Sequence, residues 1–179
     1  MRRLLDAFVA FWNVLIQPSS ERKGMNCFTY GVVISSNIMA NELFKYGVIK
    51  KKSKIAEAKI LINNNNFWRG VICGDGYVGI EGKKPKLELS GSYKICEQFQ
   101  SYCQSLVETD ASITKNKSIF RYRLNTYPAF AVLKELFGYS NYGLERKVLK
   151  AKEIIKNYTN LEERYFNDLE SKKNIPELR

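Results

Sequence analysis

One carboxylate and the glycines around it are the residues of this chain that best suit a chemical role. Residues 67–80 read Phe-Trp-Arg-Gly-Val-Ile-Cys-Gly-Asp-Gly-Tyr-Val-Gly-Ile, an apolar helical run that ends in Asp75 and Gly76. The helix dipole disfavours a carboxylate at a helix C-terminus, so a divalent cation is the obvious partner to offset that cost. A carboxylate that holds metal is the group that metal-dependent phosphodiester hydrolysis requires.

Two further glycines shape the helix that carries this carboxylate. Gly70 and Gly74 are four residues apart and therefore share one helix face. Small residues at this spacing allow a second helix to approach backbone to backbone. Gly76 suits the left-handed residue that closes many helices. The alternative interpretation is an ordinary core helix that ends Gly-Asp-Gly.

The elements that must position Asp75 follow in a regular order. After the helix over about 67–74, we expect a hairpin of 77–80 and 87–90, with residues 82–85 as its turn. Ser92 caps the next expected helix, whose buried face would contain Ile95, Phe99, Tyr102 and Leu106.

The second half of the segment repeats this pattern. We expect a hairpin over 111–124 that turns around 115–117, a helix that Pro128 opens and Phe137 closes, and a helix over about 144–158. The sequence therefore predicts an α+β fold in which the order αββαββα is followed by one further helix.

Two blocks of sequence recur in the same order. Phe28-Thr-Tyr30 precedes Glu42-Leu-Phe-Lys-Tyr46, and Phe120-Arg-Tyr122 precedes Glu135-Leu-Phe-Gly-Tyr139, at nearly equal separations. Such a repeat indicates a partial internal duplication.

Trp68 to Gly76 resembles the LAGLIDADG motif of homing endonucleases position for position, with Cys73 in place of a common acid. The resemblance implies a homing-endonuclease-like αββαββα unit with a concave antiparallel sheet. It also implies that two such helices pair about a two-fold or pseudo-two-fold axis, and that Asp75 is a catalytic residue that binds Mg²⁺ at the cleavage site in double-stranded DNA.

The same resemblance divides the chain. Residues 67–158 match one complete unit and 27–66 the second half of a preceding unit, with an apolar helix over 1–26 and a charged tail over 159–179. The front half of the first unit, with its acid, is missing. We expect the N-terminal helix, or a second copy of the chain, to pack against Gly70 and Gly74.

Further site residues follow from the family. By position after the repeated blocks, Lys147 and Lys52 match the basic residue near the metals, although a solvated face or a phosphate contact would explain either lysine equally well. The hairpins of this family read DNA in the major groove, and the candidates here are Lys83, Lys84, Lys86, Glu88, Lys115, Asn116, Lys117, Arg121 and Arg123. An ordinary polar outer face of a sheet is the alternative.

Composition narrows the classes of function. The 179 residues contain 29 Lys and Arg against 18 Asp and Glu, a net charge of +11, which favours a polyanionic partner. The absence of histidine excludes Ser-His-Asp and Cys-His catalysis. The four cysteines are Cys27, Cys73, Cys96 and Cys103, and no two of them have the spacing of a metal-binding pair. We interpret all four as free buried thiols. Free thiols indicate an intracellular, reducing compartment, cytoplasmic or organellar, rather than a secreted protein.

The N-terminal run has two interpretations. Leu4 to Ile16 is interrupted by Asp6 and Asn13, and it is shorter than the ~20 residues that span a bilayer, so a packed amphipathic helix ranks above membrane attachment.

Two functions from different classes remain. The first is a minimal or truncated LAGLIDADG homing endonuclease. The second is a non-catalytic DNA-binding relic or an intron-RNA maturase-like protein, which the missing first acid favours.

Overall fold

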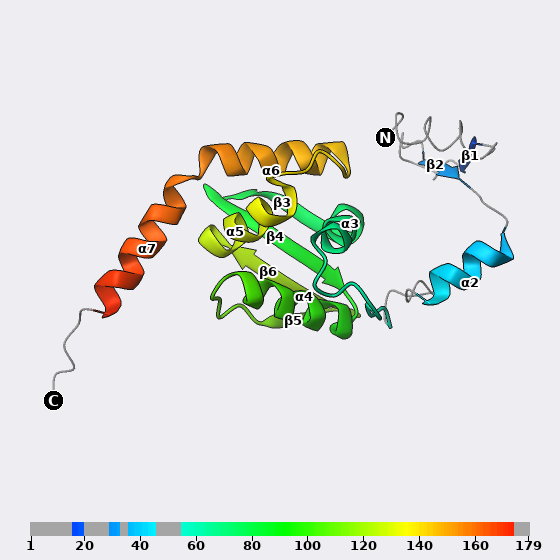
Figure 1. Cartoon of the computed structure of the whole chain (residues 1–179), viewed down its shortest axis with the longest axis horizontal. Coiled ribbons are helices and arrows are strands. Elements are labelled where there is room, and N and C mark those ends of the chain that lie inside the picture. Colours follow the sequence, from blue (N-terminus) through cyan, green and yellow to red (C-terminus); the bar gives the residue numbers. More distant parts are fainter. Residues whose placement is uncertain (1–15, 20–28, 33–35, 46–54, 174–179) are drawn as a thin grey trace. The chain divides into compact units, whose positions relative to one another are not determined.

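A computed structural model of the chain describes residues 16–19, 29–32, 36–45 and 55–173. The described residues belong to two compact units, Met1–Glu42 and Leu43–Arg179 (Figure 1). In the first unit, β1 (Ile16–Ser19) and β2 (Thr29–Val32) pair antiparallel. Helix α2 (Asn37–Lys45) follows and crosses the boundary between the units. Strand β2 and helix α2 lie within the first of the two repeated segments, which spans 28–46. The helix predicted for 1–26 is wrong at residues 16–19, which form a strand, and the rest of that prediction lies outside the described residues.

The second unit has the predicted order of elements. Helix α3 (Asn65–Asp75) leads into the hairpin of β3 (Gly76–Glu81) and β4 (Lys84–Gly91), and α4 (Tyr93–Leu106) follows. The hairpin of β5 (Ile113–Asn116) and β6 (Ile119–Asn125) then precedes α5 (Thr126–Phe137) and α6 (Glu145–Asn157). The α+β class is confirmed, and the elements run αββαββα from α3 to α5, followed by α6 and then α7.

Local chemistry explains where the helices begin. The side chain of Asn64 accepts a hydrogen bond from the Phe67 N–H at 3.0 Å, so α3 starts two residues earlier than predicted. Ser92 caps α4 as predicted, because its hydroxyl accepts from the Ile95 N–H at 3.1 Å.

The four strands form one antiparallel sheet in the order β3-β4-β6-β5. Each hairpin closes with a two-residue turn, Gly82-Lys83 and Lys117-Ser118, because Glu81 pairs with Lys84 and Asn116 with Ile119. Lys83 and Lys117 adopt positive φ angles of 67° and 54°. Both turns are thus shorter than predicted, and the first residues of β4 fall where the sequence predicted a turn.

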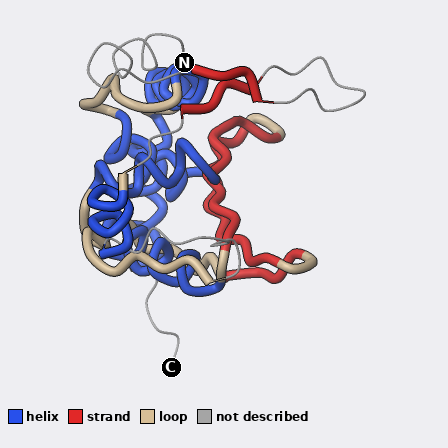
Figure 2. Tube along the Cα trace, turned by 90° about the vertical axis from the view of Figure 1, so that its right-hand side faces the viewer, coloured by secondary structure: helices blue, strands red, loops and turns tan. Residues whose placement is uncertain are grey.

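One face of the sheet is covered by helices. Leu87 lies opposite Leu124, and Leu89 lies opposite Tyr122, and all four side chains are buried. Helices α4 and α5 contact β4 and β6, while α3 and α6 lie beside β3. Figure 2 shows the helices on one side of the strands and both hairpin tips curving toward the other side. No helix of residues 55–173 covers that second face, which we call the open face.

The helical layer completes the core. Trp68 and Ile72 of α3 pack with Phe99 and Tyr102 of α4, and the Trp68 and Phe99 ring centroids are 5.1 Å apart. Leu106 was predicted to be buried on α4 but is 40% exposed, because it is the last residue of that helix and faces solvent. Cys96 and Cys103 take part in this buried face instead.

The tail begins as a packed helix rather than a fraying one. Helix α7 (Asn160–Lys173) contacts α5 through Tyr165, whose ring stacks on Tyr127 with centroids 4.0 Å apart. Lys134 of α5 pairs with Glu162 at 2.8 Å. The part of the predicted 159–179 tail that contains Glu162 and Tyr165 is therefore packed against α5.

Within the part of the chain that the structure describes, no helix combines the length and the hydropathy needed to cross a membrane.

Candidate nucleic-acid interface

Asp75 is the last residue of α3, as the sequence predicted, and it is exposed. Gly76 follows as the first residue of β3 with φ −93° and ψ 167°, an extended conformation, so the predicted left-handed cap is wrong. A Cβ at Gly76 would lie 2.8 Å from the backbone of Ile72. Glycine is needed here because the chain turns from helix to strand against the helix itself, with no space for a side chain.

Lys147 lies directly at this helix end. Its side chain is buried, and its ammonium group donates to the carbonyl oxygens of Ile72 at 2.7 Å, Cys73 at 2.9 Å and Gly76 at 2.5 Å. The last carbonyls of a helix have no partner within it, so a cation from α6 satisfies them. Lys147 therefore fastens α6 to the junction that carries Asp75.

Burial lowers the pKa of Lys147, and the charge of Arg146 lowers it further, whereas Cys73 and Asp75 raise it. Lys147 thus supplies positive charge at the helix end, where the sequence predicted a metal ion.

The described residues of one chain do not by themselves provide a fitting Mg²⁺ site at Asp75. Mg²⁺ prefers several oxygen ligands in octahedral geometry. The carbonyl oxygens nearest the end of α3 are already bound by Lys147. Among the described residues, no three His, Cys, Asp or Glu side chains lie together as a metal-binding group. This arrangement of residues therefore does not by itself support a step of a cleavage reaction.

Gly70 and Gly74 are both exposed on α3, on the side away from the buried Trp68 and Ile72. A Cβ at either glycine would meet no atom within 4 Å. The smooth face predicted from their spacing is therefore open among the residues that the structure describes. The N-terminal residues that the sequence placed against it lie outside that set.

The open face of the sheet carries charged side chains from both hairpins. Because neighbouring residues of a strand point to opposite faces, burial of Leu87, Leu89, Tyr122 and Leu124 directs the residues between and beside them outward. The segments 76–91 and 113–125 contain seven Lys and Arg against two Glu. The candidate DNA-binding residues all belong to these two hairpins, as predicted.

Four of these candidates form an ion-pair cluster. Glu88 lies 2.9 Å from the Nε atoms of both Arg121 and Arg123, and 3.8 Å from the Lys86 ammonium. Lys86 also pairs with Glu81 at 2.8 Å and is itself buried. Lys86 thus joins the carboxylates of Glu81 and Glu88, and its predicted contact with DNA stays a prediction.

Other candidates lie at or near the hairpin tips. Lys83 and Lys84 are exposed at the first turn, and Lys115 and Lys117 are exposed at the second, where Asn116 is half-buried. Both tips curve toward the open face (Figure 2), and at the first tip the Lys83 carbonyl accepts a hydrogen bond from the Tyr158 hydroxyl, at the end of α6, at 3.1 Å. Lys83, Lys84 and Lys117 are the positive charges most accessible to a large polyanion on the open face. Lys115 lies opposite Phe120, which packs on the core, and therefore belongs to the helix-covered side of the sheet.

Tyr77 is a residue that sequence reasoning missed. Its ring lies over Gly79 of the same strand, so that a Cβ at Gly79 would come within 2.3 Å of the Tyr77 hydroxyl. The Lys86 ammonium lies 5.4 Å from the ring centroid, and the side chain is 47% exposed. Tyr77 and Gly79 are two residues apart and so share one face of the strand. A glycine at this position leaves room for the tyrosine ring, and this spacing could have predicted an aromatic ring on the open face.

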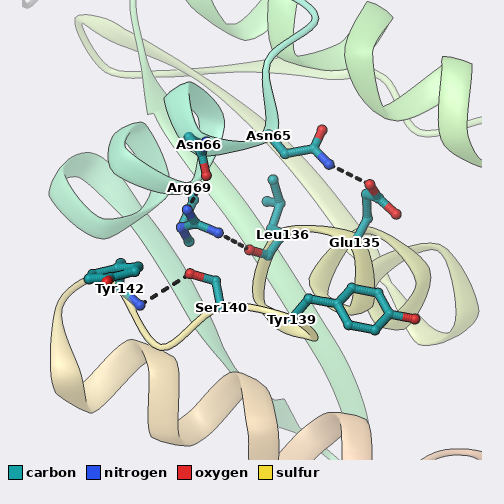
Figure 3. A pocket seen from close by; sticks show the side chains of 8 residues that line it. All are labelled: Asn65, Asn66, Arg69, Glu135, Leu136, Tyr139, Ser140 and Tyr142. Atoms are coloured by element: carbon teal, nitrogen blue, oxygen red, sulfur yellow. Dashed lines mark hydrogen bonds between the residues drawn. The ribbon is translucent and has the colours of Figure 1, made fainter.

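A separate hollow of about 420 Å³ lies between α3 and the loop after α5. Figure 3 shows its lining, in which Arg69 donates to Asn66 and, at 3.0 Å, to the Leu136 carbonyl, while Asn65 donates to Glu135. Tyr139 and Tyr142 are exposed at its edge. Because these polar groups bind one another, we assign no ligand to this hollow.

The three cysteines within the described residues form no alternative catalytic or metal-binding site. Cys96 and Cys103 are free and buried as predicted, whereas Cys73 is only half-buried and its sulfur accepts from the Leu144 N–H at 3.2 Å. Cys27 and the candidate catalytic residue Lys52 lie outside the described residues.

No protein-family model matches the sequence, and no curated protein matches it. The LAGLIDADG resemblance therefore stays a prediction, carried by residues 68–76 and by the order of the elements.

Proposed function

We propose that this chain binds double-stranded DNA on the open face of its four-stranded sheet, in the manner of a LAGLIDADG protein. The observation that carries the proposal is the contrast between the two faces. Helices bury one face, and the other bears four basic residues, Lys84, Lys86, Arg121 and Arg123, against two acidic ones, Glu81 and Glu88. Lys83 and Lys117 add two further positive charges at the turns. A polyanion is the partner that this charge distribution attracts.

Duplex DNA suits the shape of this surface. Two-stranded antiparallel ribbons fit the width of the major groove, and both hairpin tips project from the same side of the sheet (Figure 2). The exposed lysines at the tips are suited to phosphates, whereas Arg121 and Arg123 lie further inside the sheet, where base edges would come.

Cleavage is the second part of the proposal and depends on assembly. A single chain supplies one carboxylate at the end of α3, so we propose that cutting with Mg²⁺ requires a second Asp75 from another copy of the chain. The exposed faces of Gly70 and Gly74 would let the two α3 helices pack closely enough to bring the carboxylates together.

Binding is tested by fluorescence anisotropy with duplex DNA of random sequence over a range of salt concentrations. The logarithm of the association constant should fall with the logarithm of salt concentration, with a slope near −0.9 for each phosphate neutralised. A flat dependence on salt would remove the open face as a DNA surface. Tighter binding to structured RNA than to duplex DNA would favour the maturase-like alternative.

Cleavage is tested by incubating the protein with a genomic DNA library and Mg²⁺, after its mass in solution has been measured. Asp75→Asn should abolish cutting and leave DNA affinity similar, because the carboxamide keeps the shape but loses the charge that holds metal. Cutting at the wild-type rate by this variant would exclude Asp75 from the reaction.

Binding without cleavage is the second candidate function. The observation that favours it is the position of Lys147, whose ammonium occupies the carbonyl oxygens at the end of α3 and offsets the charge of Asp75 in a single chain. DNA affinity without any Mg²⁺-dependent cutting, in a chain that sizing shows to be dimeric, would support this function over the first.

A further inference from the structure

In the ion-pair cluster on the open face, Arg121 and Arg123 contact Glu88 with different hydrogen-bond geometry. The Glu88 side chain is 12% exposed, and its two carboxylate oxygens face different arginines at the same distance of 2.9 Å. Arg123 lies directly opposite Glu88 in the register of β4 and β6, and its Nε–H donates a hydrogen bond to the carboxylate. This pair is held by both charge and hydrogen bonding.

Arg121 is held less well. Its Nε atom is buried and lies 2.9 Å from the carboxylate, yet the N–H does not point at the oxygen, so the atom has no hydrogen-bond partner. A buried donor without an acceptor carries a desolvation cost that a better-placed acceptor would remove. Arg121 therefore has more to gain from a new anionic partner than Arg123 has.

Phosphate and base-edge acceptors are the groups that an arginine fork binds best, often with two parallel hydrogen bonds. A duplex on the open face would bring such acceptors to Arg121, whose side chain is 29% exposed. Glu88 would then compete with the nucleic acid for the same guanidinium group. The carboxylate also repels any phosphate that approaches without an arginine to meet it.

We propose that Glu88 is an internal competitor for nucleic acid: it holds Arg121 and Arg123 in the free protein, and DNA binding exchanges the Arg121–Glu88 pair for an Arg121–DNA contact while Arg123 stays on Glu88. This inference rests on the proposed function and adds regulation to the same surface. Its consequence is that Glu88 weakens binding to arbitrary sequences, so that only a duplex with an acceptor at Arg121 recovers the lost ion pair.

The experiment compares Glu88→Gln with Glu153→Gln. Both variants remove one negative charge, but Glu153 pairs with Lys150 on helix α6, away from the sheet. With a duplex of random sequence as probe, Glu88→Gln should bind about tenfold more tightly at low salt, with a salt dependence steeper by about one phosphate contact, near 0.9 in slope. Glu153→Gln should change the affinity by less than about twofold, because its charge is exposed and screened by salt.

A second pair of variants tests the inequality of the arginines. Arg121→Gln should weaken DNA binding more than Arg123→Gln, and it should cancel most of the gain when combined with Glu88→Gln. Circular dichroism and thermal unfolding report whether each variant folds; if Glu88→Gln does not fold, the comparison of the two arginine variants carries the test.

The outcomes are distinct. Equal effects of Glu88→Gln and Glu153→Gln, or equal losses from the two arginine variants, would overturn the inference while DNA binding by the wild-type chain would leave the proposed function standing. No DNA binding by the wild-type chain would overturn both.

Discussion

At the scale of single residues, Lys147 has the most unusual environment in the described part of the chain. It is a buried lysine whose ammonium donates to three backbone carbonyls, those of Ile72, Cys73 and Gly76. Such a group is stable only because its charge and all of its donors meet partners. The family resemblance assigned it a catalytic role, and its contacts also give it a structural one, so stability and activity must be measured separately.

We expect Lys147→Met to lower the free energy of unfolding by roughly 2–4 kcal/mol, because the carbonyls of Ile72, Cys73 and Gly76 would each lose the hydrogen bond from the ammonium. Lys150→Met on the same helix removes an exposed ion pair with Glu153 and should cost less than about 1 kcal/mol. Urea unfolding of both variants measures the difference. Equal losses would mean that the carbonyls find other partners and that Lys147 is not a structural link.

Cys96 makes stability depend on alkaline pH. Burial raises the pKa of its thiol from the ordinary value of 9.0 to about 11. Because the folded pKa is the higher one, this contribution to stability is full below pH 9 and is lost as pH rises toward 11, as the unfolded thiol ionises first. Burial also raises the pKa of Cys103, which acts in the same direction.

We therefore expect the free energy of unfolding to fall between about pH 9 and pH 11, and that of Cys96→Ala to fall less steeply than that of the wild type over the same interval. The comparison uses slopes, because the cavity left by alanine shifts stability at every pH. Denaturant unfolding at several pH values measures both slopes. An unchanged slope in the variant would show that Cys96 is not the titrating group.

At the scale of elements, α3 is where local sequence and tertiary packing meet. Its apolar spacing, its Asn64 cap and its acidic end are visible in the sequence, and so the helix and the position of Asp75 were predictable. The conformation of Gly76 was not, because it depends on how closely β3 returns past Ile72. The same holds for the turns, since the pairing of whole strands moved them away from the predicted residues.

The glycines of this element separate two kinds of constraint. Gly76→Ala should destabilise the protein by roughly 1–3 kcal/mol, because the new methyl group would collide with the Ile72 backbone 2.8 Å away. Gly74→Ala meets no atom within 4 Å and should stabilise the isolated chain by about 0.5–1 kcal/mol through its better helix propensity.

Thermal unfolding checks both values, and analytical ultracentrifugation adds a second result. If Gly70 and Gly74 form the dimer contact, Gly74→Ala should weaken self-association even as it stabilises the chain. A variant that dimerises as well as the wild type would show that this face is not where two copies meet.

At the scale of the whole molecule, the order αββαββα and the two-faced sheet explain why charges far apart in sequence gather on one surface. Alternation of apolar and charged residues along β4 and β6 made the existence of this surface predictable. Its internal pairing was not predictable, because register sets Glu88 opposite Arg123 and alignment of β3 with β4 brings Lys86 between two carboxylates. Four of the predicted DNA contacts are consequently paired with one another.

The unpaired charges define the central test, which is whether the open face is the surface that binds DNA. One variant replaces three lysines of the hairpins with glutamine, and the control replaces three lysines on helices α4 and α6, so that net charge changes equally: Lys83, Lys84 and Lys117 against Lys94, Lys150 and Lys152.

The decisive measurement is the dissociation constant of each protein for duplex DNA at several salt concentrations. The account predicts that the hairpin variant loses at least about tenfold in affinity and about 0.9 in salt slope for each phosphate contact removed, while the helix variant stays within about threefold of the wild type. Equal losses in the two variants, or a larger loss in the helix variant, would contradict it.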